Sequence, residues 1–571
     1  MLFRSTPVAN WLGARGYFAS TGQSQALAGP LSYSLASTVG QSLYPFQKDW
    51  APRVAIAYSP QGTSGISKFL FGGPGQTAIR AGWGIYYDAF GEGLESRFSS
   101  SVGFSTSVVS PPSQLPAAVP RYTGFYDVPL SAFPAAPPGG FPQTAPAGSE
   151  LQGSTVDGQL RAPYTMNADF SVGRQLKGGY FLEIAFVDRQ SRRSLIGEDI
   201  AMPTNLVDPA SGMTYFQAAD LLGKYVLAGT PVQNVPKIPF WEDFWPGAAT
   251  SSLSATQAIY NVYKSSGGDW TTALYNIDIN CSPTCSKLGK NAIFNSQYVD
   301  LFGYRSIGWG NYNGLDVTLR KRLSRNYQFT FNYTLSKCED WGSSPESSGT
   351  GSDAIVNAFS PGLNKAVCDY DTTQQFSAMG VAQLPFGKNQ PFLSHANKVV
   401  DGVIGGWQLS TVFRDTTGFP VSVNNGVGFP TDWCCYGDAT QTGFVPKGGA
   451  SANSPAAVAS APGGANIFSN PAQALAGYSP TLAGQLGQRN GVRGNGIFNI
   501  DLGLSKTFHL FEFRDQPHLL QFRAEAFNAT NSVRFDPASA NLNYSNPSTF
   551  GKYTQTFGSP RVFQFSARYS F

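Results

Sequence analysis

The six cysteines are the residues whose spacing most directly suggests chemistry. They fall into three pairs along the chain: Cys281 with Cys285, Cys338 with Cys368, and Cys434 with Cys435. Pairwise grouping of this kind is typical of disulfides in the loops of proteins that face an oxidising compartment. We therefore predict loop disulfides for Cys338–Cys368 and for Cys281–Cys285. The vicinal pair is interpreted as inert loop thiols, with a redox-active pair as the alternative.

A zinc site is the competing interpretation of the cysteines, because thiolate and imidazole groups are the preferred ligands of zinc. The chain has only three histidines, His395, His509 and His518, and none is close to a cysteine in sequence. We therefore expect no metal there. His509 and His518 flank a short predicted turn and are expected to face water.

Acidic residues flank one of the cysteine pairs. These residues are Glu339, Asp340, Asp369 and Asp371. A disulfide between Cys338 and Cys368 would gather their carboxylates, which are hard oxygen ligands of the kind that Ca²⁺ prefers. The favoured interpretation is simpler: four solvated acidic loop residues with no metal.

Other chemical signatures are weak. Residues 72–75 (GGPG) are glycine-rich, but they lack the Lys-Ser/Thr ending of a phosphate-binding loop and are interpreted as a turn. We find no nucleophile triad and no metal-ligand spacing. The sequence therefore predicts no catalytic residue and no cofactor, and the protein is not expected to be an enzyme.

Composition indicates which class of protein and which kind of secondary structure to expect. It has 571 residues, with 14% aromatic and only 13% charged residues, whereas about 25% charged residues is usual in soluble domains. This length exceeds what one soluble core supports, so the chain is either multidomain or large and hollow. The formal net charge of +4, without a long basic run, argues against nucleic acid as a partner. No stretch approaches the roughly 18 apolar residues of a transmembrane helix, so any membrane crossing would use strands.

Alternation of apolar and polar residues is the clearest structural pattern. In residues 562–571, Phe563, Phe565, Ala567, Tyr569 and Phe571 alternate with polar residues. Successive strand side chains point to opposite faces, so this pattern predicts a strand with one aromatic and one wet face. The pattern recurs at residues 79–87, 315–320, 328–335, 499–505 and 520–526. The polar face would carry mixed charge from Arg80, Asp316, Arg320, Asp501, Arg523, Glu525 and Arg568.

The connections between these strands are unequal in length. Short polar links occupy residues 321–326 and 512–516, whereas long segments rich in Gly, Ser, Pro and Asn run near 91–160, 191–300, 337–372 and 424–495. Outer-membrane barrels have short periplasmic turns and long extracellular loops. The sequence thus predicts a transmembrane antiparallel β-barrel, all-β in class, with long loops outside and the C-terminus in the periplasm.

Several segments resemble one family, the Oar-like TonB-dependent receptors common in soil bacteria such as acidobacteria. They are residues 46–58 (FQKDWAPRVAIAY), 78–88 (AIRAGWGIYYD), 312–337, 369–387 (DYDTTQQFSAMGVAQLPFG), 406–420 (GWQLSTVFRDTTGFP) and 489–571. The C-terminal Phe571, with Tyr569 and Phe565 before it, also resembles the signal by which the barrel assembly machinery recognises such proteins.

The resemblance implies a barrel of about 22 strands filled by an N-terminal plug, with a carboxypeptidase-regulatory-like domain before it. No plug-like segment or secretory signal is recognised here. We therefore expect an irregular remnant or truncated strand at residues 1–45, a partial barrel of roughly 14 to 18 strands at residues 46–571, and a longer parent protein. The TonB system would be a partner only if that protein has a plug.

The predicted function is nutrient uptake by the β-barrel portion of a TonB-dependent receptor in the cell outer membrane of a Gram-negative bacterium. Its partners would be outer-membrane lipid and an unknown extracellular ligand; iron chelates, peptides and glycans are all alternatives. A surface adhesion or secretion-related barrel without transport is the second hypothesis. The third, a soluble β-rich glycan-binding protein, predicts that the aromatic faces are buried between sheets.

Overall fold

The computed structural model describes most of the chain. The described residues are 13–17, 21, 30–33, 48–88, 142–156, 160–280, 286–324, 326–343, 354–388, 390–426, 428–433, 437–446 and 465–571. Within these ranges, no helix is both long and apolar enough to cross a membrane.

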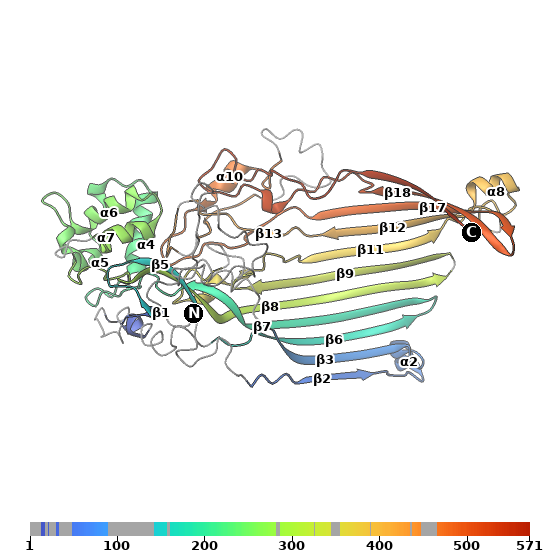
Figure 1. The fold of residues 1–571 in the computed structure, drawn as a ribbon, viewed down its shortest axis with the longest axis horizontal. Helices are drawn as coiled ribbons and strands as arrows, with labels where there is room; N and C mark the ends of the chain where they lie inside the picture. Colours follow the sequence, from blue (N-terminus) through green and yellow to red (C-terminus); the bar gives the residue numbers. More distant parts are fainter. Residues whose placement is uncertain are drawn as a thin grey trace, which may run out of the picture.

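One large sheet forms the body of the molecule (Figure 1). Its strands follow one another in hydrogen-bonded order from β2 to β19, and each pairs antiparallel with its neighbours. The order is β2 (Arg53–Tyr58), β3 (Thr77–Tyr87), β6 (Tyr164–Leu176), β7 (Tyr180–Asp199), β8 (Tyr298–Ser324), β9 (Tyr327–Asp340), β11 (Gln374–Gln383), β12 (Trp407–Thr416), β17 (Ile497–Phe513), β18 (Gln516–Phe527) and β19 (Val562–Ser570). Off this path, β10 (Ala366–Val367) pairs with β9, and β5 (Leu151–Val156) pairs parallel with β8.

The two faces of the sheet differ as the alternation predicts. On central strands, Ile184, Phe186, Leu315, Phe331 and Leu335 belong to one face and are exposed rather than packed against a second sheet. An apolar sheet face of this extent is stable only against lipid or another apolar surface. The soluble glycan-binding alternative, which required burial of this face, is therefore wrong.

The sheet path has two ends, at β2 and β19. Among the described residues, eleven strands lie on the path, fewer than the roughly 14 to 18 predicted for a partial barrel of this family. The difference arises because the strands are long, with 20 residues in β7 and 27 in β8, and because much of the remaining chain forms connections. No pairing joins β2 to β19 within the described part, so the sheet is an open wall.

Connections alternate between the two ends of the sheet. Tight turns join β6 to β7, β8 to β9 and β17 to β18 at one end, which we call the short-turn end. Two further connections at this end contain a short helix each: α2 (Gly65–Phe71) between β2 and β3, and α8 (Lys398–Ile404) between β11 and β12 (Figure 1). The longer connections gather at the other end, the long-loop end, and include residues 528–561, a connection that the alternation pattern does not predict.

The connection between β7 and β8 forms a compact helical unit. Its helices are α4 (Tyr215–Leu227), α5 (Pro239–Phe244), α6 (Ala255–Ser265) and α7 (Trp270–Asp278), with the 3-10 turns η4 (Val232–Asn234) and η5 (Pro246–Ala248). Trp241, Trp245, Trp270, Tyr260 and Tyr263 are buried in its core. The prediction of a loop over residues 191–300 is wrong in this respect, because β7 continues to Asp199 and amphipathic helices bury an aromatic core beyond it.

Smaller elements complete the long-loop end. These are β1 (Ser32–Tyr33) paired with β4 (Gln143–Thr144), β13 (Pro420–Val421) with β16 (Val492–Arg493), β14 (Thr440–Gln441) with β15 (Tyr478–Ser479), α10 (Pro471–Ala476), η6 (Pro361–Asn364) and η7 (Pro537–Ser539). The N-terminal part also lies there: the guanidinium of Arg15 is buried and donates to Thr204 Oγ1 and to the carbonyl oxygen of Ile200.

Candidate functional site

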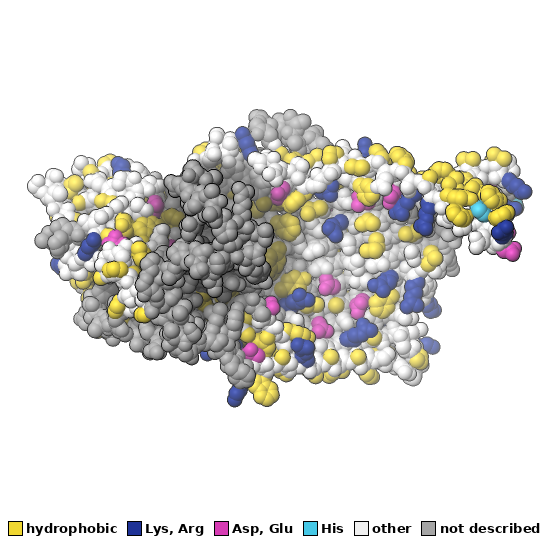
Figure 2. All heavy atoms as spheres, viewed as in Figure 1, with side chains coloured by type: hydrophobic (Ala, Val, Ile, Leu, Met, Phe, Trp, Pro, Cys, Tyr) yellow, Lys and Arg dark blue, Asp and Glu magenta, His cyan; other side chains and the backbone are white. Residues whose placement is uncertain are grey.

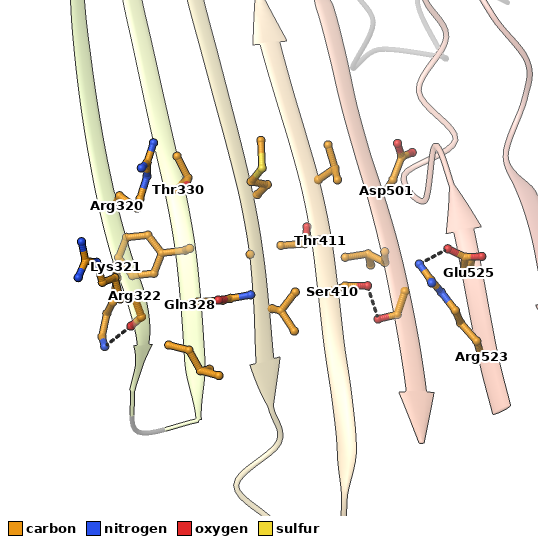
Figure 3. Close-up of a pocket in the computed structure, with 18 of the residues that line it drawn as sticks. Arg320, Lys321, Arg322, Gln328, Thr330, Ser410, Thr411, Asp501, Arg523 and Glu525 are labelled. Carbon is orange, nitrogen blue, oxygen red and sulfur yellow. Dashed lines mark hydrogen bonds and ion pairs between the residues drawn. The ribbon is translucent and has the colours of Figure 1, made fainter. Parts of the chain in front are cut away.

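The polar face of the sheet is the first surface that could contact a solute. In Figure 2, basic and acidic side chains are spread over the sheet face turned to the viewer. A hollow of about 580 Å³ lies on it, across β8, β9, β11, β12, β17 and β18. The strand register explains the lining, since directly paired residues share a face: Arg320, Thr330, Met379, Val412 and Asp501 form one transverse row. This row runs from a basic to an acidic end across five strands (Figure 3).

Some of the charges predicted for the polar face are paired within the sheet. Arg523 pairs with Glu525 at 2.7 Å, as Figure 3 shows, and Arg80 pairs with Glu183 at 3.3 Å. The carboxylate of Asp501 accepts a hydrogen bond of 2.8 Å from the backbone N–H of Asn528. The face is therefore polar and carries charges of both signs, which lets it border water or a polar solute without a strong field of one sign.

A second hollow, of about 860 Å³, lies where the polar face meets the long-loop end. We call it the mouth hollow. Its lining combines aromatic hydroxyls with charged groups, including Tyr86, Arg189, Tyr312, Asp340 and Tyr370. Such a mixture offers stacking surfaces and hydrogen bonds at one place, the composition typical of small-molecule binding sites.

The structure joins Cys338 and Cys368 in a disulfide, with Cα atoms 5.4 Å apart. Both cysteines line the mouth hollow. The backbone N–H of Cys338 donates to the carboxylate of Asp371 at 2.8 Å. The disulfide thus holds the loop that follows β9 against the rim of the hollow.

Three of the acidic residues beside this disulfide are ion-paired with arginines. Arg489 is ion-paired with Asp340 and lies 3.3 Å from Asp369, and Arg493 is ion-paired with Asp371. The interpretation of solvated carboxylates is therefore wrong for Asp340 and Asp371, which are buried. Within the described ranges, no three His, Cys, Asp or Glu side chains are grouped to hold a metal ion.

Glu339 is the fourth of these acidic residues. Lys337 and Lys365 lie 2.7 and 3.1 Å from its carboxylate oxygens. The hydrogen bond from Lys337, more than that from Lys365, lowers the pKa of Glu339 below its usual value. Each acidic residue at the rim therefore has a basic partner.

Arg489 and Arg493 were not singled out from the sequence. They lie in the connection between β12 and β17, whereas their partners lie at the end of β9 and in the connection that follows it. Nothing in the local sequence pairs residues this far apart.

The helices of the β7–β8 connection have a local sequence signal. Thr214 with Gln217, and Ser254 with Gln257, form complete capping boxes, the usual start of a helix.

The buried carboxylate of Asp278, at the end of α7, binds the backbone of the segment that leads into β8. It accepts hydrogen bonds of 2.9, 2.9 and 2.8 Å from the backbone N–H groups of Ala292, Ile293 and Phe294. Burial raises the pKa of Asp278 to about 6, although these hydrogen bonds act in the opposite direction. The residue acts as a backbone anchor between α7 and β8.

The remaining predicted site residues have the following places. Cys281, Cys285, Cys434 and Cys435 lie outside the described residues. Residues 72–75 form the turn after α2, with Gly72 at φ 70° and Gly75 at φ 70°, as expected for glycines in a tight turn.

The C-terminal aromatics occupy β19 and the residue after it. Phe565, Tyr569 and Phe571 are exposed on this end strand of the path. His518 does not simply face water: its ring stacks on Phe511 and on Phe571, and its Nδ1 is hydrogen-bonded to the Tyr569 hydroxyl. His509 is exposed, as predicted.

Comparison with known proteins identifies the family of this chain. A family model described as an outer membrane beta barrel domain matches residues 14–564. Among solved structures, the outer membrane transporter YddB from Escherichia coli aligns at 9% identity with a TM-score of 0.34, over 86% of this chain and 38% of that one. The siderophore receptor PirA from Acinetobacter baumannii aligns at 8% identity with a TM-score of 0.34, over 92% of this chain and 41% of that one.

The chain thus spans about two fifths of the length of these solved proteins. No curated protein matches it. The family match covers nearly the whole sequence, and the antiparallel sheet with one apolar and one polar face agrees with it. The chain belongs to the family of outer membrane beta barrel domains.

Proposed function

We propose that this chain is the barrel portion of an Oar-like TonB-dependent receptor that takes up a large or scarce nutrient. The observation that carries the proposal is the mouth hollow, which opens onto the polar face of the wall and is braced by Cys338–Cys368 and Arg489. In this proposal the long-loop end is extracellular, and the short-turn end and C-terminus are periplasmic. Phe565, Tyr569 and Phe571 would serve the barrel assembly machinery.

The chain's own residues would act by binding and guiding, without covalent chemistry. Tyr86, Tyr312 and Tyr370 offer aromatic faces and hydroxyls at the mouth hollow, and Arg189 offers a fork of donors. Below them, the row from Arg320 to Asp501 supplies polar contacts along the wall. Release of the ligand inward would need the energised plug of the whole protein.

Localisation is tested first, by fractionating cells that produce the whole protein and comparing its gel mobility in detergent with and without boiling. Outer-membrane protein with a heat-dependent mobility shift is the expected result. Soluble protein without a shift would contradict a membrane barrel.

Uptake is tested by offering spent medium from producing cells to strains with and without a functional TonB system. Compounds depleted only by the TonB-competent strain are identified by mass spectrometry, and the expected effect of Tyr370→Ala is weaker depletion at low concentration. Phe444→Ala, an exposed aromatic away from the mouth hollow, is the matched control. Depletion that does not depend on TonB would overturn the proposal.

The second candidate is a surface adhesion barrel. The observation in its favour is the helical unit between β7 and β8, which has its own buried core and projects at the long-loop end (Figure 1). Deleting residues 208–290 separates the two functions. Loss of cell attachment with unchanged uptake would assign adhesion to this unit, whereas loss of uptake alone would assign it to ligand capture.

A further inference from the structure

Two short helices at the short-turn end have no partner for their apolar side chains among the residues that the structure describes. Ile66 and Phe69 of α2 are each 78% exposed, and Val399 and Val403 of α8 are 76% and 65% exposed. Neither helix has a buried residue. A seven-residue helix gains little from hydrogen bonding alone and normally depends on burial of an apolar face. These helices therefore need an apolar environment that the described protein does not supply.

The position of α8 shows which side of the sheet it occupies. Lys506 lies on the apolar face, since it is two residues from Leu504 and directly opposite Trp407. Its Nζ donates to the carbonyl oxygens of Gly402 at 2.6 Å and Gly405 at 2.5 Å. The indole N–H of Trp407 donates to the Val403 carbonyl oxygen at 2.8 Å. The C-terminal carbonyls of α8 are thus held by side chains of the apolar face.

The helix α2 is held in the same way, by side chains that donate to its C-terminal carbonyls. Thr77 and Arg174 are paired across β3 and β6 and share a face with Ile79 and Val172. The Thr77 hydroxyl donates to the carbonyl oxygen of Phe71 at 2.7 Å, and the Arg174 guanidinium donates to that of Leu70. Two helices in separate connections are therefore fastened by their C-terminal carbonyls to the apolar face of the wall.

From this arrangement we infer that α2 and α8 lie in a phospholipid leaflet, at the boundary between headgroups and acyl chains. Lipid is the occupant because the apolar face to which both helices are fastened is the lipid-facing surface of an outer-membrane barrel. The exposed Ile, Phe and Val side chains extend that surface beyond the strands. Lys68 and Lys398 are placed to reach the headgroups, as is usual for helices lying in a membrane interface.

The inference rests on the periplasmic position proposed for the short-turn end but not on transport, and it is tested by photocrosslinking in living cells. The whole protein is made with Phe69→p-benzoylphenylalanine or Val403→p-benzoylphenylalanine, irradiated, and analysed for lipid adducts by mass spectrometry. Phe331, on the apolar face of β9, is the positive control, and Phe444, which is 71% exposed at the long-loop end, is the negative control.

The expected result is phospholipid adducts at positions 69 and 403 with a yield comparable to that at 331 and about tenfold above that at 444. The absence of lipid adducts at both helix positions, with adducts retained at position 331, would overturn the inference. Adducts to lipopolysaccharide instead would overturn the phospholipid assignment and place this end of the sheet in the outer leaflet. Because each helix has its own variant, misfolding of one leaves the other as an independent test.

Discussion

Arg489 connects two long loops through charges that are shielded from water. Its side chain is 1% exposed, and it bonds the carboxylate and the carbonyl oxygen of Asp340 and the carboxylate of Asp369. Its removal leaves a buried carboxylate uncompensated, which typically costs about 3 to 5 kcal/mol. We predict that Arg489→Met opens the loops locally and leaves the sheet intact.

Limited proteolysis of intact cells measures this effect. A loss of about 3 kcal/mol corresponds to a rise of about 100-fold in the cleavage rate of loops 341–372 and 424–495. Arg80→Gln is the matched control, because the Arg80–Glu183 pair is largely exposed and such pairs contribute about 1 kcal/mol or less. Equal cleavage of both variants would show that Arg489 does not brace the loops.

Asp199 and Asp300 make the stability of the long-loop end dependent on pH. They lie on β7 and β8 beyond the membrane-spanning part, and burial raises the pKa of both. The charge of Asp199 raises the pKa of Asp300 further. Arg15 acts in the opposite direction on Asp199, and Glu198 in the same direction as burial. A folded-state pKa above the unfolded value stabilises the fold at low pH. That stability is lost as pH rises from about 4 towards neutrality and above.

Asp300→Asn should therefore raise the melting temperature of the helical unit at pH 8 and change it little at pH 4. The expected gain at pH 8 is at least about 1.4 kcal/mol, the equivalent of one pKa unit. Tryptophan fluorescence reports it, because Trp241, Trp245 and Trp270 are in the core of this unit. A variant whose pH profile parallels that of the parent protein would exclude Asp300 as the source.

At the scale of elements, the helical unit depends on its helix starts. The Ser254 hydroxyl accepts a hydrogen bond from the Gln257 backbone N–H, and the Gln257 side chain accepts one from the Ser254 backbone. Ser254→Ala should destabilise the unit by about 1 kcal/mol, the usual cost of losing such a cap. Ser265→Ala, near the end of α6, is the control and should change stability by less than half as much. Calorimetry distinguishes the two.

The disulfide acts on the loop between β9 and β11. It closes a sequence separation of 30 residues, for which loop-closure entropy predicts a stabilisation of about 3 to 4 kcal/mol. Replacing both cysteines by alanine should raise proteolysis within residues 341–367 and lower ligand affinity at the mouth hollow, while leaving outer-membrane levels unchanged. Loss of the protein from the membrane would show instead that the disulfide is needed for assembly.

At the scale of the whole molecule, the open edges of the wall determine how the barrel is completed. β2 and β19 end the path, and within the described residues each pairs with one neighbour. Unpaired backbone groups in lipid cost several kcal/mol each, so we predict that further strands pair with these edges. We predict that Ile56→Cys with Phe565→Cys forms no intramolecular crosslink, whereas the directly opposed pair Ala378→Cys with Phe413→Cys does. A crosslink between positions 56 and 565 would show that this chain closes on itself.

The local sequence by itself determined the strands of the sheet and which of their faces is apolar. Alternation along residues 315–335 and 562–571 reports strand faces because neighbouring side chains point in opposite directions wherever a strand forms. Unequal spacing between such segments likewise separated short turns from long loops. Even the helical unit has a local signal, in the capping boxes at Thr214 and Ser254, although its glycine- and serine-rich surroundings are typical of a loop.

Only the tertiary structure decided how the long-loop end is held together. Asp340 and Arg489 are 149 residues apart, and no periodic pattern encodes such a pairing, because it depends on which loops meet above the sheet. The fastening of α2 and α8 is also non-local, since Arg174 and Lys506 reach them from other strands. Contacts within a strand follow from backbone geometry, whereas contacts between connections depend on the path of the whole chain.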